Sequence, residues 1–338
     1  MIVQYQDNMN DEWDDFVLNK SINGNFLQTR NFYNYHPIGE FEDVSLMFFK
    51  DNQLAAVIPA ASMDNGSSFI AHPGSTYGGI VIGRKFANTV GYNWIFNEMM
   101  TYLNESGYSK AELRMHNWLY SPIDMHNELC EYYFQLNGFS VRSEVGFYVE
   151  LGHLENEFEI GFEKLKRRKL KKAKKFNLMF KKLLSDDEVS SFYDVLRDNM
   201  KKFNTEPIHS KEQILDFKNI RLKDITSFYG VYHEGELVAG SMVWNFCDKK
   251  VFHTQYLASR LDALDYCPNE YLYANLIRAA KDEGYRYLSY GTACLNNGSI
   301  YNESLGMYKE GFNTDSYLNR CFVWEREKTD EKYQGLYR

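Results

Sequence analysis

The sequence is poor in cysteine and proline, and it has no long apolar run. Five cysteines and six prolines occur in 338 residues, and the cysteines are scattered and odd in number. This argues against a disulfide framework and predicts a reducing compartment, the cytoplasm. No run of about 18 apolar residues is present, so we predict no membrane span. The acidic start, MIVQYQDNMNDEWDDF, lacks the basic and apolar regions of a secretory signal, so none is expected.

Several motifs that define cofactor and metal sites are also missing. The chain has no G-x-x-x-x-G-K-[ST] loop and no G-x-G-x-x-G after a strand pattern, which excludes those two phosphate-binding motifs. Its eight histidines form no H-E-x-x-H motif and no close cluster with cysteine, so no metal site is predicted. The net charge of −8 excludes a protein that coats nucleic acid, and DNA is not an expected partner. Any basic binding site must therefore be local.

What the chain does contain is a pair of segments that recurs in each half. Residues 45–61 (SLMFFKDNQLAAVIPAA) and 228–244 (FYGVYHEGELVAGSMVW) each hold two apolar runs around a charged turn, a pattern typical of a β-hairpin. Residues 93–115 and 269–291 each carry apolar residues at helical spacing, then a Gly-Tyr pair and a strand pattern. The two matches keep the same order along the chain, which suggests a duplicated unit.

This repeat predicts two similar α/β (α+β) domains, residues 1–150 and 151–338. Each would contain a hairpin, a connection, a helix and a strand in a mixed twisted sheet flanked by helices. A single large domain remains the alternative, because hairpins and helix–Gly–strand units are each common.

A very basic segment opens the second half. Residues 163–176, EKLKRRKLKKAKKF, contain nine lysines or arginines, and helical spacing places apolar side chains on one face: Phe162, Leu165, Ala173 and Phe176, with Leu170 beside it. One interpretation is a solvated charged face. Another is a docking site for a sugar nucleotide, a lipid-linked diphosphate or an RNA backbone. Arg167 and Arg168 are the preferred phosphate ligands, because the guanidinium fork matches phosphate oxygens.

A glycine-rich segment, HPGSTYGGIVIG at 72–83, follows the first hairpin. Its four glycines are typical of a turn between strands, or of a backbone that a ligand approaches closely. In the second interpretation, Tyr77 is the side chain at the edge of a cleft.

The order of these elements resembles the GNAT acyltransferase superfamily, and within it the Fem-type aminoacyl transferases of peptidoglycan bridge synthesis, which carry two GNAT-like domains. The resemblance is carried by LKRRKLKKAKKFNLMF, GELVAGSMVW, NEYLYANLIRAAKDEGYRYLSYG and LGMYKEGF, the last being similar to the family's aromatic-Lys-x-x-Phe motif. Two features depart from relatives: no long helical-hairpin arm is present, and SRLDALDYCPNEYLY replaces the glycine-bearing loop that holds CoA pyrophosphate. The donor therefore stays open between acyl-CoA and aminoacyl-tRNA, and no tightly bound cofactor is expected.

The resemblance implies that Lys309 lies at an acyl-transfer centre, where a cation stabilises a tetrahedral oxyanion or the leaving group. Tyr308 and Phe312 would hold its stem and exclude water, with Tyr290 and Tyr256 as wall residues. By spacing alone, Lys309 could equally extend from a short helix while the rings pack in the core.

The implied function is acyl or aminoacyl transfer to an amine or hydroxyl of a cell-envelope precursor, such as a sugar nucleotide or a muropeptide. A tRNA would be a partner if it supplies the aminoacyl group. Two alternatives stay open: a CoA-dependent N- or O-acyltransferase acting on a small molecule, and a catalytically idle tandem module that binds a phosphorylated ligand.

Overall fold

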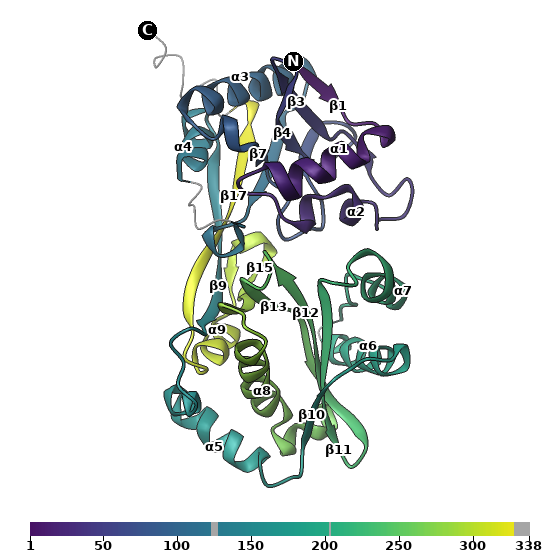
Figure 1. The fold of residues 1–338 in the computed structure, drawn as a ribbon, viewed down its shortest axis with the longest axis vertical. Coiled ribbons are helices and arrows are strands. Elements are labelled where there is room, and N and C mark those ends of the chain that lie inside the picture. Colours follow the sequence, from purple (N-terminus) through teal and green to yellow (C-terminus); the bar gives the residue numbers. More distant parts are fainter. Residues whose placement is uncertain (123–127, 203, 328–338) are drawn as a thin grey trace. The chain divides into compact units, whose positions relative to one another are not determined.

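The computed structural model describes residues 1–122, 128–202 and 204–327 (Figure 1). They separate into two compact units, Met1–Glu144 with the described residues from Leu318 to Glu327, and Val145–Tyr317. The predicted division after residue 150 placed the C-terminal segment in the second domain. In the structure, β17 (Asp315–Glu325) pairs with β8 (Lys110–Met115) over its last six residues, so this segment belongs to the first unit. No helix in the described ranges combines the length and apolar character that crossing a bilayer requires.

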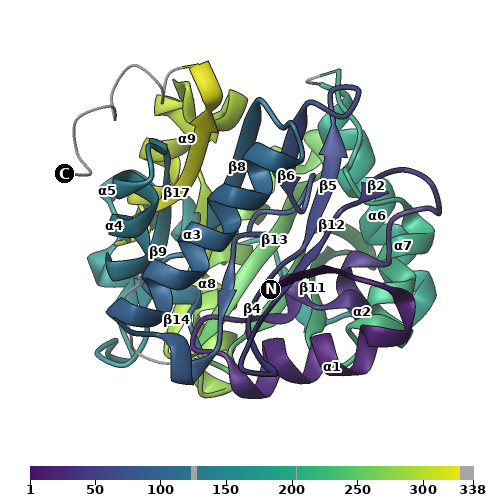
Figure 2. The same cartoon turned by 90° about the horizontal axis from the view of Figure 1, so that it is seen from above.

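The first unit combines antiparallel and parallel strand pairs with helices packed on them. One sheet is antiparallel, in the order β1 (Ile2–Gln4), β3 (Leu46–Lys50), β4 (Gln53–Ile58) and β7 (Val81–Ile82). Other strands run in the order β17, β8, β6 (Ser68–Ala71), β5 (Ala60–Met63) and β2 (Glu42–Asp43). The helices are α1 (Asn10–Asp15), α2 (Arg30–Tyr33), α3 (Thr89–Glu105) and α4 (Glu128–Leu136). Helix α3 shares one hydrophobic core with β6 and β8 (Figure 2).

The second unit is built on a mixed sheet with helices on both faces. The strand order is β10 (Met179–Lys182), β11 (Thr226–His233), β12 (Glu236–Phe246), β13 (Val251–Ser259), β14 (Tyr287–Thr292) and β9 (Ser140–Glu150), with only the β13–β14 pair parallel. Two short strands, β15 (Cys294–Leu295) and β16 (Ile300–Tyr301), form a separate pair. The helices are α5 (Lys164–Ala173), α6 (Asp186–Lys201), α7 (Lys211–Asp216), α8 (Pro268–Asp282) and α9 (Glu303–Glu310).

Alternate residues of β11 and β12 determine which helix covers which face. Tyr229 and Val231 share a core with α8, whereas Phe228 and Gly240 meet Phe192 of α6. Because successive strand residues point to opposite faces, α6 and α8 cover opposite sides of the sheet. The predicted mixed α/β architecture is confirmed.

Both predicted hairpins are present. Asp51 and Asn52 join β3 to β4 with φ of 52° and 58°, and Glu234 and Gly235 join β11 to β12 with φ of 49° and 87°. Two consecutive positive φ values are the geometry of a tight hairpin turn that matches strand twist. The hairpins of the two units therefore share one turn conformation as well as one sequence pattern.

Both predicted helix–Gly–strand units are also present. Gly107 (φ 78°) follows α3 and Gly284 (φ 83°) follows α8, and each precedes a strand, β8 or β14. The copies differ at Pro59, which lies between β4 and β5 where the second unit has the unbroken strand β12. Proline cannot donate to a strand ladder, so it ends the pairing of β4 at this position.

Candidate functional site

The parallel strands β13 and β14 stay paired over three residues and then separate. Val251–His253 pair with Tyr287–Ser289, and the later residues of each strand pair with the neighbour on its other side. Register shifts occur at the same level in both flanking ladders, after Met242 in β12 and after Ser289 in β14. Bulges end pairing and re-aim side chains. The sheet therefore opens between β13 and β14 beyond Ser289.

The amine of Lys309 reaches the end of β14 from helix α9. Its Nζ donates hydrogen bonds to the carbonyl oxygens of Gly291 (3.2 Å) and Thr292 (2.6 Å). Gly291 has φ of 67°, which glycine adopts without strain. The side chain of Lys309 forms no ion pair with any carboxylate in the described ranges, and burial lowers its pKa to about 7. The amine is therefore held by neutral carbonyls and changes charge near neutral pH.

Next to Gly291, three buried side chains form a polar cluster. Ser289 Oγ lies 3.3 Å from His253 Nδ1 and 3.0 Å from Tyr317 OH, and it accepts a hydrogen bond from the Gly291 amide (3.1 Å). Burial, together with the positive charge of Lys309, lowers the pKa of His253 to about 3. The imidazole is therefore neutral, and the cluster adds hydrogen-bonding groups rather than charge. Sequence reasoning did not single out these three residues, because 36 and 28 positions separate them.

The cation among the aromatic rings in and just after α9 is Lys166, whereas Lys309 was the residue expected there. Lys166 Nζ lies 3.1 Å from the ring centroid of Tyr308 and 4.9 Å from that of Phe312. Phe312 in turn lies 6.1 Å, centroid to centroid, from the buried ring of Tyr290. Successive helix residues point about 100° apart, so Tyr308 and Lys309 meet different neighbours. That these rings contact a substrate stays a prediction.

The buried face of α5 differs from the predicted one. The basic helix is present, but Leu165 is exposed, while Lys166 is buried beside Leu170. The ammonium of Lys166 lies 3.6 Å from Glu270 Oε1, and Lys169 lies 3.2 Å from the same oxygen. Burial lowers the pKa of Lys166 to about 8, against the opposing effect of Glu270. Lysine can take an apolar position because its stem consists of methylene groups.

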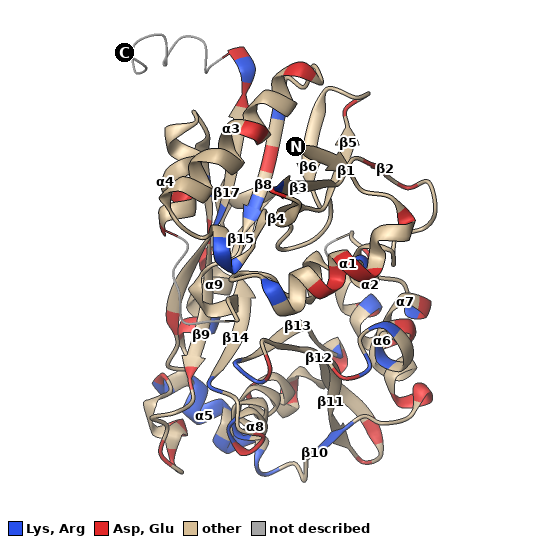
Figure 3. Ribbon diagram, turned by 45° about the horizontal axis from the view of Figure 1, so that its top comes forward, with Lys and Arg blue, Asp and Glu red and all other residues tan. Residues whose placement is uncertain are grey.

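Figure 3 shows α5 as a mainly basic helix, and its other basic residues are more exposed than Lys166. Arg167 and Arg168 are exposed and form no ion pair with another described residue, and the same holds for Lys171, Lys172 and Lys175. These cations give the helix a local positive field on an acidic protein. The geometry is compatible with both interpretations drawn from the sequence, a solvated face and a phosphate-binding face.

Tyr256 and Tyr77, the other predicted site residues, are held within their own units. Tyr256 OH lies 2.8 Å from His209 Nδ1, and burial raises the pKa of this phenol. Tyr77 belongs to the first unit, is 1% exposed, and donates a hydrogen bond to Asn319 Oδ1 at 2.9 Å. Their roles in substrate binding remain predictions.

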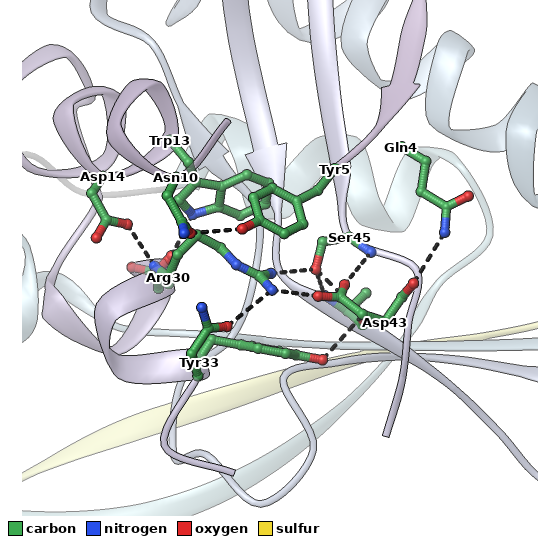
Figure 4. A network of polar contacts seen from close by, with 12 residues as sticks. Gln4, Tyr5, Asn10, Trp13, Asp14, Arg30, Tyr33, Asp43 and Ser45 are labelled. Atoms are coloured by element: carbon green, nitrogen blue, oxygen red, sulfur yellow. Dashed lines mark hydrogen bonds and ion pairs between the residues drawn. The ribbon is translucent and has the colours of Figure 1, made fainter. Parts of the chain in front are cut away.

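The first unit has a buried cation of its own, Arg30 of α2 (Figure 4). The guanidinium carbon lies 3.7 Å from the ring centroid of Tyr5 and 4.4 Å from that of Tyr33. It donates a hydrogen bond to Ser45 Oγ (3.0 Å) and forms an ion pair with Asp43. Since the protein itself supplies the anion and the aromatic faces, this cluster joins α2 to the strands and is not an open anion site.

The loop after β13 does not form a glycine-rich phosphate cradle. A 3-10 helix, Leu261–Tyr266, fills it, and α8 then begins with Pro268, which has no N–H. Arg260 is already paired with Glu236 (2.7 Å) and Asp262 (2.6 Å). Glu270 in the first turn of α8 adds a buried carboxylate at the positive end of that helix. Pro268, Glu270 and the paired Arg260 therefore disfavour binding of the CoA pyrophosphate at this loop.

Part of the second unit matches a known protein family. Residues 164–301 match the family model described as an acetyltransferase (GNAT) domain. The predicted GNAT resemblance is confirmed for this part of the chain, which carries an acyltransferase domain. No curated protein matches the sequence.

Solved structures share the fold over nearly the whole chain. FemX superposes with a TM-score of 0.67 at 12% identity, covering 99% of both chains. The C-terminal domain of a putative lysylphosphatidylglycerol synthetase from Agrobacterium fabrum gives 0.59 at 13% identity, covering 95% of this chain and 93% of that one. A tandem GNAT protein from the clavulanic acid biosynthesis pathway gives 0.51 at 9% identity, covering 96% and 98%. The predicted tandem GNAT-like and Fem-like architecture is confirmed.

Proposed function

We propose that this chain is a cytoplasmic transferase that moves an acyl or aminoacyl group to an amine or hydroxyl of a cell-envelope precursor. The observation that carries the proposal is the buried amine of Lys309, hydrogen-bonded to two carbonyls where β13 and β14 separate. The match of residues 164–301 to the GNAT domain supplies the reaction type. The fold shared with FemX and with a putative lysylphosphatidylglycerol synthetase favours aminoacyl transfer and an envelope acceptor.

In this proposal Lys309 acts in both protonation states. Its neutral amine takes the proton that the acceptor loses as the acceptor nitrogen or oxygen attacks the acyl carbonyl carbon. The resulting ammonium stabilises the tetrahedral oxyanion and returns the proton to the leaving oxygen or sulfur as that bond breaks. A pKa of about 7 suits both transfers, because a catalytic acid–base group is most effective near the working pH. The neutral His253 and Ser289 would keep the surroundings polar without adding a competing charge.

The donor in this proposal is an aminoacyl-tRNA, with acyl-CoA as the alternative. Pro268, Glu270 and the paired Arg260 stand where a pyrophosphate cradle would need free amides and an unpaired cation. The GNAT domain match is the observation that keeps acyl-CoA open. The acceptor is a sugar nucleotide or a muropeptide, and its phosphate would bind the outer face of α5 through Arg167 and Arg168, whose guanidinium groups are exposed and unpaired among the described residues.

A ligand panel tests the proposal. The melting temperature of the full chain would be measured with acetyl-CoA, a longer acyl-CoA, UDP-linked sugars and short RNA, each at low and high salt. A ligand that binds only the folded protein raises its stability by mass action. We expect a rise with UDP-sugars or RNA that decreases with salt. A rise with CoA species alone would favour the CoA-dependent enzyme, and a phosphorylated ligand that binds without any transfer would favour the idle module.

The double variant Arg167→Gln/Arg168→Gln extends this test to α5. Losing two charge-assisted hydrogen bonds should weaken phosphate-ligand affinity by roughly tenfold or more. The matched control is Lys202→Gln/Lys223→Gln, which removes the same charge from exposed lysines away from α5. Equal affinity in both double variants would show that the basic face is only solvated.

A further inference from the structure

We infer that Lys166 is a positioning residue for the reacting centre: its ammonium, seated on the face of Tyr308, fixes α9 so that Lys309 stays at the carbonyls of Gly291 and Thr292. This rests on the proposed function, since it assigns Lys166 a part in the same centre. Lys166 thereby has a different role from the neighbouring cations of α5, which face solvent.

The contact between α5 and α9 depends on a glycine. A Cβ atom added at Gly311 would lie 2.8 Å from Lys166 Cε and 2.9 Å from its Cγ, so the lysine stem occupies the space that a side chain would fill. The Glu163 amide donates a hydrogen bond to the Gly311 carbonyl at 2.9 Å. Phe162 meets Phe312 edge to face at 5.2 Å. The end of α9 is therefore fixed by the residues that lead into α5 and by its first turn.

The contacts of Lys166 depend on its positive charge, which an apolar residue at this position would lack. Its Nζ lies between the Tyr308 ring (3.1 Å to the centroid) and Glu270 Oε1 (3.6 Å), and both Lys166 and Glu270 are at most 4% exposed. A cation–π contact strengthens when it is desolvated. Lys169 and Glu163 also act on Lys166, the first against its charge and the second in favour of it. These contacts fix the orientation of the Tyr308 ring. Because this ring belongs to α9, they also fix the rotation of α9 about its own axis.

Lys166 acts on Lys309 through the orientation of α9. Tyr308 and Lys309 are adjacent on α9, so the rotation that places the ring on Lys166 also aims the Lys309 side chain at the end of β14. Burial is the main cause of the lowered pKa of Lys309. Loss of Lys166 should therefore raise the pKa of Lys309 by reducing the burial of the Lys309 amine.

Competitive trace labelling with acetic anhydride tests this without a substrate. The full chain would be labelled between pH 5.5 and 10.5, and mass spectrometry would give the titration midpoint of each lysine. Lys166→Met keeps the stem and removes the charge. Lys169→Met is the matched control, because Lys169 pairs with the same Glu270 oxygen but is half-exposed. We expect the Lys309 midpoint to rise by about one pH unit or more in Lys166→Met, as burial is lost, and to stay unchanged in Lys169→Met.

The outcomes separate this inference from the proposed function. A folded Lys166→Met protein whose Lys309 midpoint equals that of the wild type would overturn the positioning role alone. A wild-type Lys309 midpoint near 10.5 would instead contradict the proposed function. If Lys166→Met does not fold, Tyr308→Leu keeps an apolar side chain and removes the ring face, and it should raise the Lys309 midpoint in the same way. An unchanged midpoint in Tyr308→Leu would also overturn the inference.

Discussion

Replacing Lys309 by methionine is expected to lower kcat by roughly 10²- to 10³-fold with a smaller change in KM, because removing one preorganised group that stabilises an oxyanion has this effect. Methionine keeps the length and apolar character of the stem but has no amine for the carbonyls of Gly291 and Thr292. The measurement is steady-state kinetics with the donor and acceptor that the ligand panel identifies.

The pH profile of kcat makes this prediction more specific. With a pKa of about 7, Lys309 is protonated below this pH and cannot accept the acceptor's proton, so the wild-type rate should fall as the pH drops through 7. The Lys309→Met variant should lose that limb. Lys223→Met, at an exposed position, is the control and should keep both the rate and the limb. A Lys309→Met enzyme that retains half of the wild-type kcat would refute a catalytic role.

The largest expected loss of stability follows from Asp43→Ala in the first unit. Arg30 is 2% exposed, so removal of the Asp43 carboxylate leaves a buried guanidinium without its anion. Removing the partner of a buried charge in this way costs about 3 kcal/mol or more. Urea unfolding, followed by tryptophan fluorescence, would measure this, because Trp13 lies against the guanidinium at 5.5 Å.

A double variant separates this effect from a general loss of packing. In Arg30→Met/Asp43→Ala the buried charge is removed together with its partner, so most of the lost stability should return. If the double variant is as unstable as Asp43→Ala alone, the instability does not come from an unpaired guanidinium, and the cluster around Tyr5 and Tyr33 is held mainly by packing.

The hairpins and helix ends were predictable because the residues that determine them lie within the same short segments of sequence. Asp51-Asn52 and Glu234-Gly235 supply the positive φ values that tight hairpin turns need, and both hairpins form. Gly107 and Gly284 mark the ends of two helices in the same way. Such residues act on their own backbone, so their effect can be read without knowing what packs around them.

The buried face of α5 was not predictable from polarity. A hydrophobic pattern counts Leu165 as apolar and Lys166 as polar, yet Leu165 is exposed and Lys166 is buried. The deciding partners, Glu270 and Tyr308, lie more than a hundred positions away along the chain. The catalytic role that the resemblance implies for Lys309 stays a prediction. Tyr308 and Phe312, which were expected to hold Lys309, contact Lys166 instead, because adjacent positions on a short helix face different neighbours.

The polar cluster at Ser289 could not be found in the sequence either. His253 and Ser289 meet because β13 and β14 are parallel and in register, and Tyr317 reaches the same hydroxyl from β17. Only the pairing of strands brings them together. The place of β17 depends in the same way on pairing with β8, which the division after residue 150 did not anticipate.

The most direct measurement is an NMR titration of the Lys309 side chain, with selectively labelled lysine and the Lys309→Met protein for assignment. We predict a midpoint near pH 7, since the amine is buried and its contacts are neutral carbonyls. A midpoint near the ordinary lysine value of 10.5 would mean that the amine is solvated and unable to exchange protons at neutral pH, and it would contradict the central role given to Lys309.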